Sequence, residues 1–248
     1  LCAAATGAHA QAVEGVYVGA DVGYSWTNGI SGKSNVVSPA GGNLQWKFDR
    51  EDTPVGFLRL GARVAPNWRV ELEGGYRNGD IESVRGAGPG QPIGLCTAGI
   101  GRTAAAPNCG APVGELRVGS LMANVIYDFM PDSKLNPFVG LGVGAIEVHN
   151  KVFGQLSGVP AGGQQYQNVS FDDVEQATAA QGIIGVSYAL SPNWNLDVTG
   201  RYLMSDDMNF YSLNTRAGGG AGALTDTGRF NGHYNEATAT VGVRYTFG

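Results

Sequence analysis

The feature that most constrains this chain is a strict two-residue alternation at its carboxyl end. The odd-numbered positions are apolar: Val241, Val243, Tyr245 and Phe247. The even-numbered positions between them are Thr240, Gly242, Arg244 and Thr246. Successive side chains of a β-strand point to opposite faces, so this stretch predicts a strand with one apolar and one polar face. Such a strand suits a barrel with lipid outside and a polar lumen inside, and also a soluble β-sandwich.

Composition narrows the class of protein. The chain has 248 residues, 40 of them Gly, with 15% charged residues and a formal net charge of -5. This length is enough for one large all-β domain. Neither a basic balance nor a basic patch is present, so no nucleic acid is expected as a partner. No run of 18 apolar residues occurs, which excludes a helical membrane span.

Residues 1–12 are interpreted as the remnant of a secretory signal peptide, followed by a β-domain over residues 13–248. Two small-x-small sites end at Ala10 and Ala12, and we place signal cleavage after Ala12. Lipidation at Cys2 and an ordinary N-terminal segment remain as weaker alternatives. The lipidation alternative is weak because Leu1 stands where a small residue is preferred.

The other two cysteines, Cys96 and Cys109, lie in a segment rich in Gly, Pro and Ala. An exported protein folds in an oxidising compartment, so we expect a disulfide between them. The bridge would close a loop of about 15 residues and stabilise the fold by roughly 3 kcal/mol in the chain-entropy view. A metal site is the weaker interpretation, since no His lies near them in the sequence.

Turn signals divide the chain unevenly. Short breaks built on Pro and a small polar residue lie at 65–67, 130–134 and 191–193. Long polar breaks lie at about 27–51, 79–114, 149–173 and 205–232. Long loops that alternate with short turns are typical of bacterial outer-membrane barrels, in which the short turns face the periplasm.

Eight candidate strands lie between these breaks. Their approximate ranges are 16–26, 54–64, 68–76, 115–129, 136–149, 174–190, 194–202 and the alternating carboxyl end. Two of them begin with Trp68 or Trp194 and end with Tyr76 or Tyr202, and membrane interfaces select such aromatic residues. The pattern predicts an all-β fold, an eight-stranded antiparallel transmembrane up-and-down β-barrel with long extracellular loops and short periplasmic turns. A soluble sandwich would need neither the aromatic bands nor the uneven loops.

The inward parity of these strands carries charges of both signs. The predicted lumen charge network consists of Asp21, Arg59, Arg63, Arg69, Glu71, Glu73, Arg77, Asp128, Asp197, Arg201 and Arg244. A buried unpaired charge is costly, so we expect these groups to pair. An eight-stranded barrel is just filled by side chains, which favours a packed polar plug. A narrow solute path stays open as the alternative, because many inward Gly residues leave room either for it or for the long Arg side chains.

Catalytic, cofactor and metal sites are not predicted. A lipid-modifying barrel enzyme would need a His near a Ser and a carboxylate at the outer rim. The candidates are His149 and His233, with Glu147 and Glu236 close to them in sequence and Ser170 and Ser212 able to approach in space. No fixed short spacing joins a Ser to either His, so an enzyme is the most distant of the three functional hypotheses.

Several stretches together resemble the small outer-membrane β-barrel family of alphaproteobacteria, which is related to opacity proteins and to the OmpA membrane domain. They are residues 15–19 and 23–24, 137–144, 201–202 and 244–247. The carboxyl end also resembles the assembly signal of such barrels in Thr240, Gly242, Tyr245 and Phe247, with Gly248 departing from it. The long second loop with Cys96 and the Gly-rich fourth loop depart from the family pattern.

The resemblance implies a location and a set of partners. It implies a non-enzymatic protein of a Gram-negative outer membrane, with its loops facing the cell exterior and no cofactor. Such proteins are tied to envelope integrity, adhesion or immune exposure. The expected partners are outer-membrane lipid and lipopolysaccharide, the barrel-assembly machinery, and neighbouring envelope proteins or a host surface contacted through the loops. A narrow porin-like channel for small solutes is the alternative function.

Overall fold

The part of the chain that the structure describes is built from antiparallel β-strands. The computed structural model describes residues 15–37, 43–86, 94–99, 110–156, 167–216 and 227–247. Its strands are β1 (Val16–Val37), β2 (Asn43–Arg50), β3 (Thr53–Ala65), β4 (Trp68–Gly86), β5 (Leu95–Cys96), β6 (Val113–Asp128), β7 (Leu135–Leu156), β8 (Gln167–Ala189), β9 (Trp194–Ser205), β10 (Met208–Tyr211), β11 (Leu213–Arg216) and β12 (Arg229–Thr246). Among these residues, no helix has the length and apolar character needed to cross a membrane.

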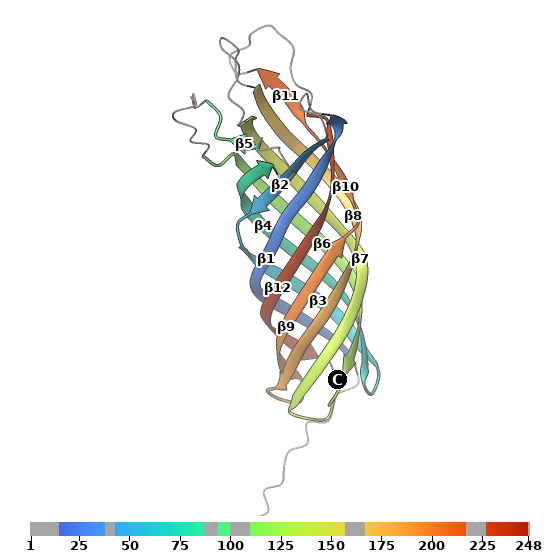
Figure 1. The fold of residues 1–248 in the computed structure, drawn as a ribbon. Coiled ribbons are helices and arrows are strands. Elements are labelled where there is room, and N and C mark those ends of the chain that lie inside the picture. The colour runs from blue at the N-terminus through green and yellow to red at the C-terminus, as the bar shows by residue number, and fades with distance from the viewer. Residues whose placement is uncertain are drawn as a thin grey trace, which may run out of the picture.

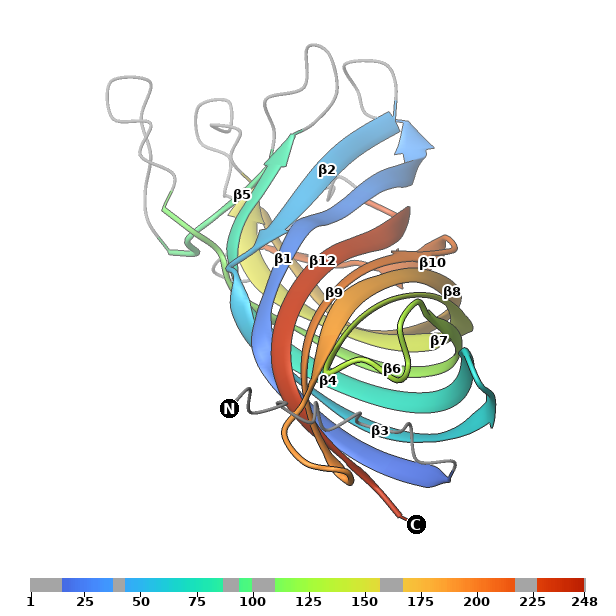
Figure 2. The ribbon, with the colours of Figure 1, turned by 90° about the horizontal axis from the view of Figure 1, so that it is seen from below.

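Eight of these strands form a closed ring (Figure 1, Figure 2). The order around the ring is β1, β3, β4, β6, β7, β8, β9 and β12, and each strand pairs antiparallel with the next. β12 pairs with β1 from Thr246 opposite Tyr17 to Glu236 opposite Thr27, which closes the ring. The predicted eight-stranded antiparallel barrel is confirmed. The strands β2, β5, β10 and β11 lengthen the wall unevenly at the end away from the short turns.

The segments predicted as long loops are in large part strand. β1 continues to Val37, β4 to Gly86 and β7 to Leu156, while β8 already begins at Gln167 and β12 at Arg229. The predicted loop bounds of 27–51, 79–114, 149–173 and 205–232 were therefore wrong. The physical reason is a change of polarity along the barrel. In these extensions most outward side chains are polar, with Phe153 as an exception, and a polar composition on an exposed face is easily taken for a loop.

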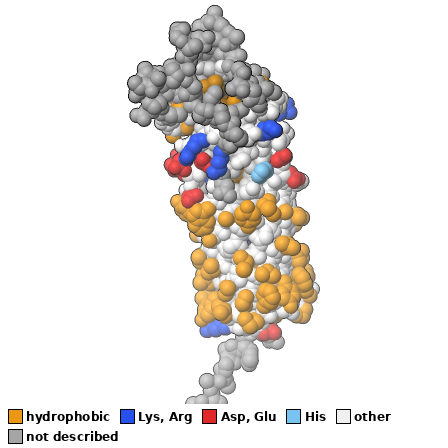
Figure 3. Space-filling view, in the orientation of Figure 1, with side chains coloured by type: hydrophobic (Ala, Val, Ile, Leu, Met, Phe, Trp, Pro, Cys, Tyr) orange, Lys and Arg blue, Asp and Glu red, His pale blue; other side chains and the backbone are white. Residues whose placement is uncertain are grey.

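The barrel consists of two sections of opposite polarity. The membrane section extends from the short turns to the level of Trp26, Tyr76 and Tyr202, and its outer wall is a band of apolar side chains (Figure 3). Leu141, for example, is 75% exposed on this wall. The distal section lies beyond that level, with charged side chains outside and apolar side chains inside. An apolar coat on one section alone matches a barrel that crosses a bilayer and projects from it.

Aromatic rings fill the core of the distal section. Trp46 of β2 is fully buried, and its ring stacks on Phe230 with centroids 4.7 Å apart. The Phe48 and Phe171 rings meet edge to face at 5.3 Å, and Phe171 also contacts Phe230 at 5.6 Å. Such aromatic pairs add about 0.5–1.5 kcal/mol each beyond the burial of their area. The distal section is therefore a packed continuation of the barrel.

A β-bulge reverses the parity of β1 between the two sections. Its pairing with β12 shifts between Thr27 and Ile30, so that Trp26 lies on the outer wall while Ile30 is buried in the distal core. Gly29 within the bulge has a φ of 72°, and a Cβ there would overlap with the carbonyl oxygen of Phe48. Only glycine tolerates both constraints, so the reversal depends on this residue.

Candidate functional site

The lumen of the membrane section holds an ion-pair network that runs along the barrel axis. All eleven residues of the predicted network lie on the inward parity of β1, β3, β4, β6, β9 and β12, and all but Arg63 are buried. Side chains alternate across each strand, so the apolar coat of this section leaves its polar parity inside. The chemistry of the site is therefore set by how these charges meet.

Asp21 of β1 is the centre of the network. Its Oδ1 accepts a hydrogen bond from Arg59 Nη2 at 2.7 Å, and its Oδ2 accepts one from Arg201 Nη2 at 2.8 Å. Arg59 also reaches Asp197 at 3.0 Å, and Arg201 reaches Glu73 at 2.8 Å. These chains of paired charges link opposite walls, because the partners come from β1, β3, β4 and β9.

The network continues to the short-turn end of the barrel. Arg69 holds Asp128 with two hydrogen bonds of 2.8 Å, the bidentate geometry that a guanidinium and a carboxylate favour. Arg63 contacts the same carboxylate at 3.1 Å. Arg244 donates to Ser187 Oγ at 2.8 Å, and its Nε lies 3.2 Å from Asp197.

Two members of the network were missed from the sequence. Glu236 accepts a 2.6 Å contact from Arg77 and a 3.4 Å contact from Arg50, and Tyr234 donates to it at 2.9 Å. Arg50 falls in a segment predicted as loop. Glu236 was considered only as a neighbour of His233, although counting back by two from Thr240 places it on the inward parity. This cluster marks the boundary with the aromatic distal core.

Inward glycines make room for the charged side chains. A Cβ at Gly19 would lie only 3.0 to 3.2 Å from the guanidinium of Arg59, and a Cβ at Gly242 would overlap with Asp21 Oδ1. Aromatic rings take up further space, with the Arg201 guanidinium 4.3 Å from the Phe57 ring centroid. At these positions the space left by glycine is occupied by the network itself.

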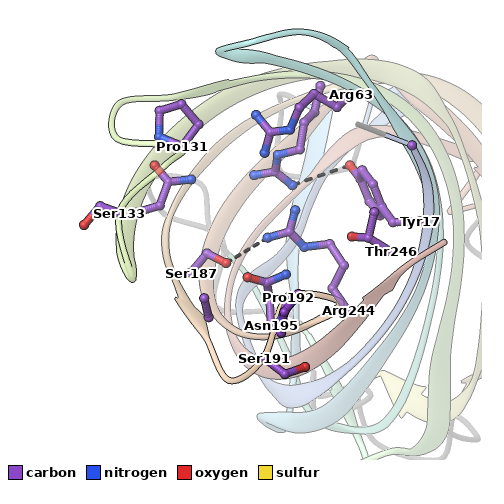
Figure 4. Close-up of a pocket in the computed structure, with 14 residues that line it drawn as sticks. Tyr17, Arg63, Pro131, Ser133, Ser187, Ser191, Pro192, Asn195, Arg244 and Thr246 are labelled. Atoms are coloured by element: carbon purple, nitrogen blue, oxygen red, sulfur yellow. Dashed lines mark hydrogen bonds between the residues drawn. The ribbon is translucent and has the colours of Figure 1, made fainter. Parts of the chain in front are cut away.

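A small hollow opens at the short-turn end of the lumen (Figure 4). Its volume is about 40 Å³, and Arg63, Arg69 and Arg244 line it together with Ser187 and Asn195. Figure 4 shows the Arg63 and Arg244 side chains extending into the same space, from β3 and β12, the two neighbours of β1. The hollow therefore exposes the basic end of the network to the short-turn side.

The two rim histidines lie on the outer surface of the distal section. His149 Nε2 is 2.9 Å from Asp172 Oδ1, and this hydrogen bond is the largest cause that lowers the pKa of Asp172 below its usual value. His233 Nδ1 is 3.6 Å from Asp207. Ser212 Oγ donates to the carbonyl oxygen of Gly228 and contacts no histidine in the described residues.

The other residues considered for an enzyme, Glu147, Ser170 and Glu236, also have neighbours other than the two histidines. Glu147 accepts a hydrogen bond from Gln176 at 2.8 Å, and Ser170 lies on β8 opposite Phe153 and Leu213. Glu236 is turned into the lumen, away from the rim. Within the described ranges, no group of three or more His, Cys, Asp or Glu side chains is placed to hold a metal ion.

Cys96 lies on β5 and is buried and disulfide-bonded. Its predicted partner, Cys109, lies outside the described residues. Thr97 donates its amide to the carbonyl oxygen of Gly110 at 3.2 Å, so the chain next to Cys96 runs beside the residue that follows Cys109. The Cys96–Cys109 pairing stays a prediction that this neighbourhood supports. The predicted signal remnant, residues 1–12, likewise lies outside the described residues.

The four residues of the predicted assembly signal divide between the two faces of β12. Thr240 and Gly242 face the lumen, where the Thr240 hydroxyl accepts a hydrogen bond from Arg201 at 2.8 Å. Tyr245 and Phe247 meet edge to face at 5.0 Å near the short-turn end. The strand therefore combines lumen and lipid-facing roles, while its part in assembly remains a prediction.

Comparisons with known proteins agree with this architecture. The family model described as outer membrane protein beta-barrel domain matches residues 1–247. An uncharacterized protein of Brucella abortus is 31% identical over 137 residues, which are 52% of this chain and 47% of that protein. The chain thus spans about half the length of the curated relatives it matches.

Solved structures show the same fold at low sequence identity. The outer membrane protein OprG from Pseudomonas aeruginosa has a TM-score of 0.56 at 14% identity, covering 96% of this chain and 98% of that one. The outer membrane protease OmpT from Escherichia coli has a TM-score of 0.50 at 11% identity, covering 94% and 97%. Identities this low carry the likeness of fold alone.

Proposed function

Because the chain belongs to the family of outer-membrane β-barrel proteins, we propose that it is a non-enzymatic barrel with a closed lumen, whose distal end is its interaction surface. One observation carries this proposal: each carboxylate of the ion-pair network has a guanidinium partner. The carboxylates are Asp21, Glu71, Glu73, Asp128, Asp197 and Glu236. A solute path needs charges that line a gap, whereas paired charges from opposite walls fill it.

The distal section supports the interaction role. Strands continue the barrel wall beyond the apolar band, so the end of the molecule is a rigid support, and a rigid support holds binding groups more precisely than a loop does. Short turns face the periplasm in this kind of barrel, so the distal end would face the cell exterior. Its outer surface carries the charged residues Glu147, Lys151 and Asp172 together with His149.

The partners of this surface follow from its position. The membrane section lies in outer-membrane lipid. The charged side chains on the outer surface of the distal section, directly above the apolar band, are at the height of lipopolysaccharide headgroups. Neighbouring envelope proteins or a host surface would be reached by the distal end. The barrel-assembly machinery would recognise the carboxyl-terminal strand by its Tyr245 and Phe247 side chains.

Single-channel conductance of the purified, folded protein in a planar bilayer tests the closed lumen. Wild type, Arg63→Ala and Arg244→Ala are measured side by side, with heat-modifiable gel mobility as the check of folding. We expect the wild type to be silent. Reproducible conductance steps that change in the two variants would overturn the closed lumen and establish the alternative, a narrow channel for small solutes.

Lipid analysis tests the non-enzymatic part. Purified protein is incubated with outer-membrane lipids, and the lipids are examined by mass spectrometry with His149→Ala and His233→Ala as comparisons. We expect no lipid product in any sample. A product made by the wild type and lost in either variant would contradict the proposal.

A further inference from the structure

The hollow at the short-turn end has the chemistry of an anion site. We propose that it binds one carboxylate group that arrives from the periplasmic side. Its volume of about 40 Å³ would hold roughly three waters, which is also the scale of a carboxylate group. The three guanidinium groups that line it come from β3, β4 and β12 and converge on one space (Figure 4).

Arginines outnumber carboxylates in the ion-pair network, and those at the hollow share their carboxylates. Seven guanidinium groups face six carboxylates in the ion pairs of the described lumen, because Arg50 joins the six arginines of the predicted network. Asp128 is shared by Arg63 and Arg69, and Arg244 shares Asp197 with Arg59. The side chain of Arg63 is 10% exposed, more than any other arginine of the network. The three arginines of the hollow therefore contact two carboxylates between them, Asp128 and Asp197, whereas the excess of Arg50 and Arg77 over Glu236 lies at the other end of the network.

Donor capacity remains in the hollow as well. The Nε of Arg244 has no hydrogen-bond partner of acceptable geometry, although the residue is only 4% exposed. The nearest carboxylate, Asp197, lies 3.2 Å from this atom but is also contacted by Arg59 at 3.0 Å. A buried guanidinium nitrogen without a partner is costly, so this end of the network holds a donor that the carboxylates already present do not satisfy.

The geometry and charge favour a carboxylate over a phosphate. A guanidinium presents a planar fork that matches the two oxygen atoms of a carboxylate. A carboxylate carries one negative charge, which equals the excess of the three guanidiniums at the hollow over the two carboxylates that they contact. A phosphate monoester carries about 1.5 to 2 negative charges at neutral pH, and this exceeds the imbalance.

Binding is measured on the full chain, folded in detergent micelles with ¹⁵N-labelled arginine. The probes are sodium acetate, N-acetylglycine and inorganic phosphate, and the signal is the Arg244 Nε–H resonance, assigned by its loss in Arg244→Lys. We expect a saturable shift with both carboxylates and a weaker effect of phosphate. Equal affinity for acetate and N-acetylglycine would identify a free small carboxylate as the ligand, and tighter N-acetylglycine would identify a peptide carboxyl terminus.

Three variants separate the site from general basic surface. Arg63→Gln leaves Asp128 paired with Arg69 and should weaken carboxylate binding at least about tenfold, the effect of losing one charge-assisted contact. Arg63→Lys keeps the positive charge but lacks the planar fork of a guanidinium. Its affinity for a carboxylate should therefore lie between the affinities of the wild type and of Arg63→Gln. Arg85→Gln removes an exposed arginine of the distal section and should bind as the wild type does.

Three results would overturn the carboxylate site. They are the absence of a saturable shift in the wild type, tighter binding of phosphate than of either carboxylate, and equal weakening by Arg63→Gln and Arg85→Gln. If Arg63→Gln does not fold by gel mobility, the wild-type titration and Arg63→Lys still decide the question. None of these outcomes depends on whether the lumen conducts.

Discussion

The two sections of this barrel solve the same packing problem with opposite chemistry. The membrane section has an apolar coat and an ionic core, whereas the distal section has a charged coat and an aromatic core. Ion pairs are directional and fail when one partner is lost, because the other charge stays buried. Apolar contacts are non-directional, so their loss scales with the area and cavity involved. In each section the outer side chains suit the surroundings, lipid or water, and the alternation of side chains along the strands places the opposite polarity in the core.

The largest effect is expected from Asp21→Ala in the ionic core. The change leaves Arg59 without its shortest contact and Arg201 without one of its 2.8 Å contacts, and breaking a buried pair in this way costs about 3–5 kcal/mol. The free energy of unfolding is measured by urea titration in lipid vesicles. Asp49→Ala is the matched control, because its pair with Lys47 lies on the outer face of the distal section, partly exposed, and is expected to contribute less than about 1 kcal/mol. Equal losses in the two variants would contradict the distinction between core and coat.

A smaller and more local effect is expected from Trp46→Ala in the aromatic core. Removing the ring takes away its stack on Phe230 and opens a cavity, at a cost of about 3 kcal/mol. The loss should appear as faster proteolysis of the distal section, with the heat-modifiable mobility of the membrane section unchanged. Trp46→Phe keeps most of the packing and removes the buried Nε1 that has no partner, so it should stay within about 1 kcal/mol. Loss of the membrane section in Trp46→Ala would show that the two sections unfold together.

Replacing glycine by alanine should destabilise the protein on the lumen face of the membrane section and not on its lipid face. Gly242 faces the ionic core, and a Cβ there would overlap with Asp21, so Gly242→Ala should cost about 1–3 kcal/mol. Gly74 faces the apolar coat, and a Cβ there would meet no atom within 4 Å, so Gly74→Ala should be neutral or stabilise by about 0.4–1 kcal/mol. Urea titration of both variants checks this, and a cost at Gly74 would contradict it.

The sequence was informative where one polarity rule held along a strand. The alternation at 240–247 and the paired Trp68 and Trp194 predicted the barrel and its inward charges, because lipid requires an unbroken apolar coat. The distal section escaped prediction because apolar residues there lie inside, and the bulge at Gly29 shifts their parity. The ion-pair partners could not be assigned either, since most pairs join residues that are far apart in sequence, such as Arg201 with Asp21.

The smallest effect is expected on the charged coat of the distal section, at Asp172. The hydrogen bond from His149 lowers the pKa of this carboxyl, with a weaker contribution from the charge of Lys151. A carboxyl whose pKa is lower in the folded state stabilises the fold above its unfolded pKa of about 3.9, and loses that contribution as the pH falls through the folded value. Direct ¹³C titration of Asp172 should show its pKa rising toward the usual value in His149→Ala, and rising less in Lys151→Gln. A larger rise in Lys151→Gln would mean that the charge of nearby surface residues, and not the hydrogen bond from His149, is what lowers the pKa of Asp172. Because His149 and Lys151 lie on the outer surface of the distal section, neither variant should change the ionic core or the conductance of the barrel.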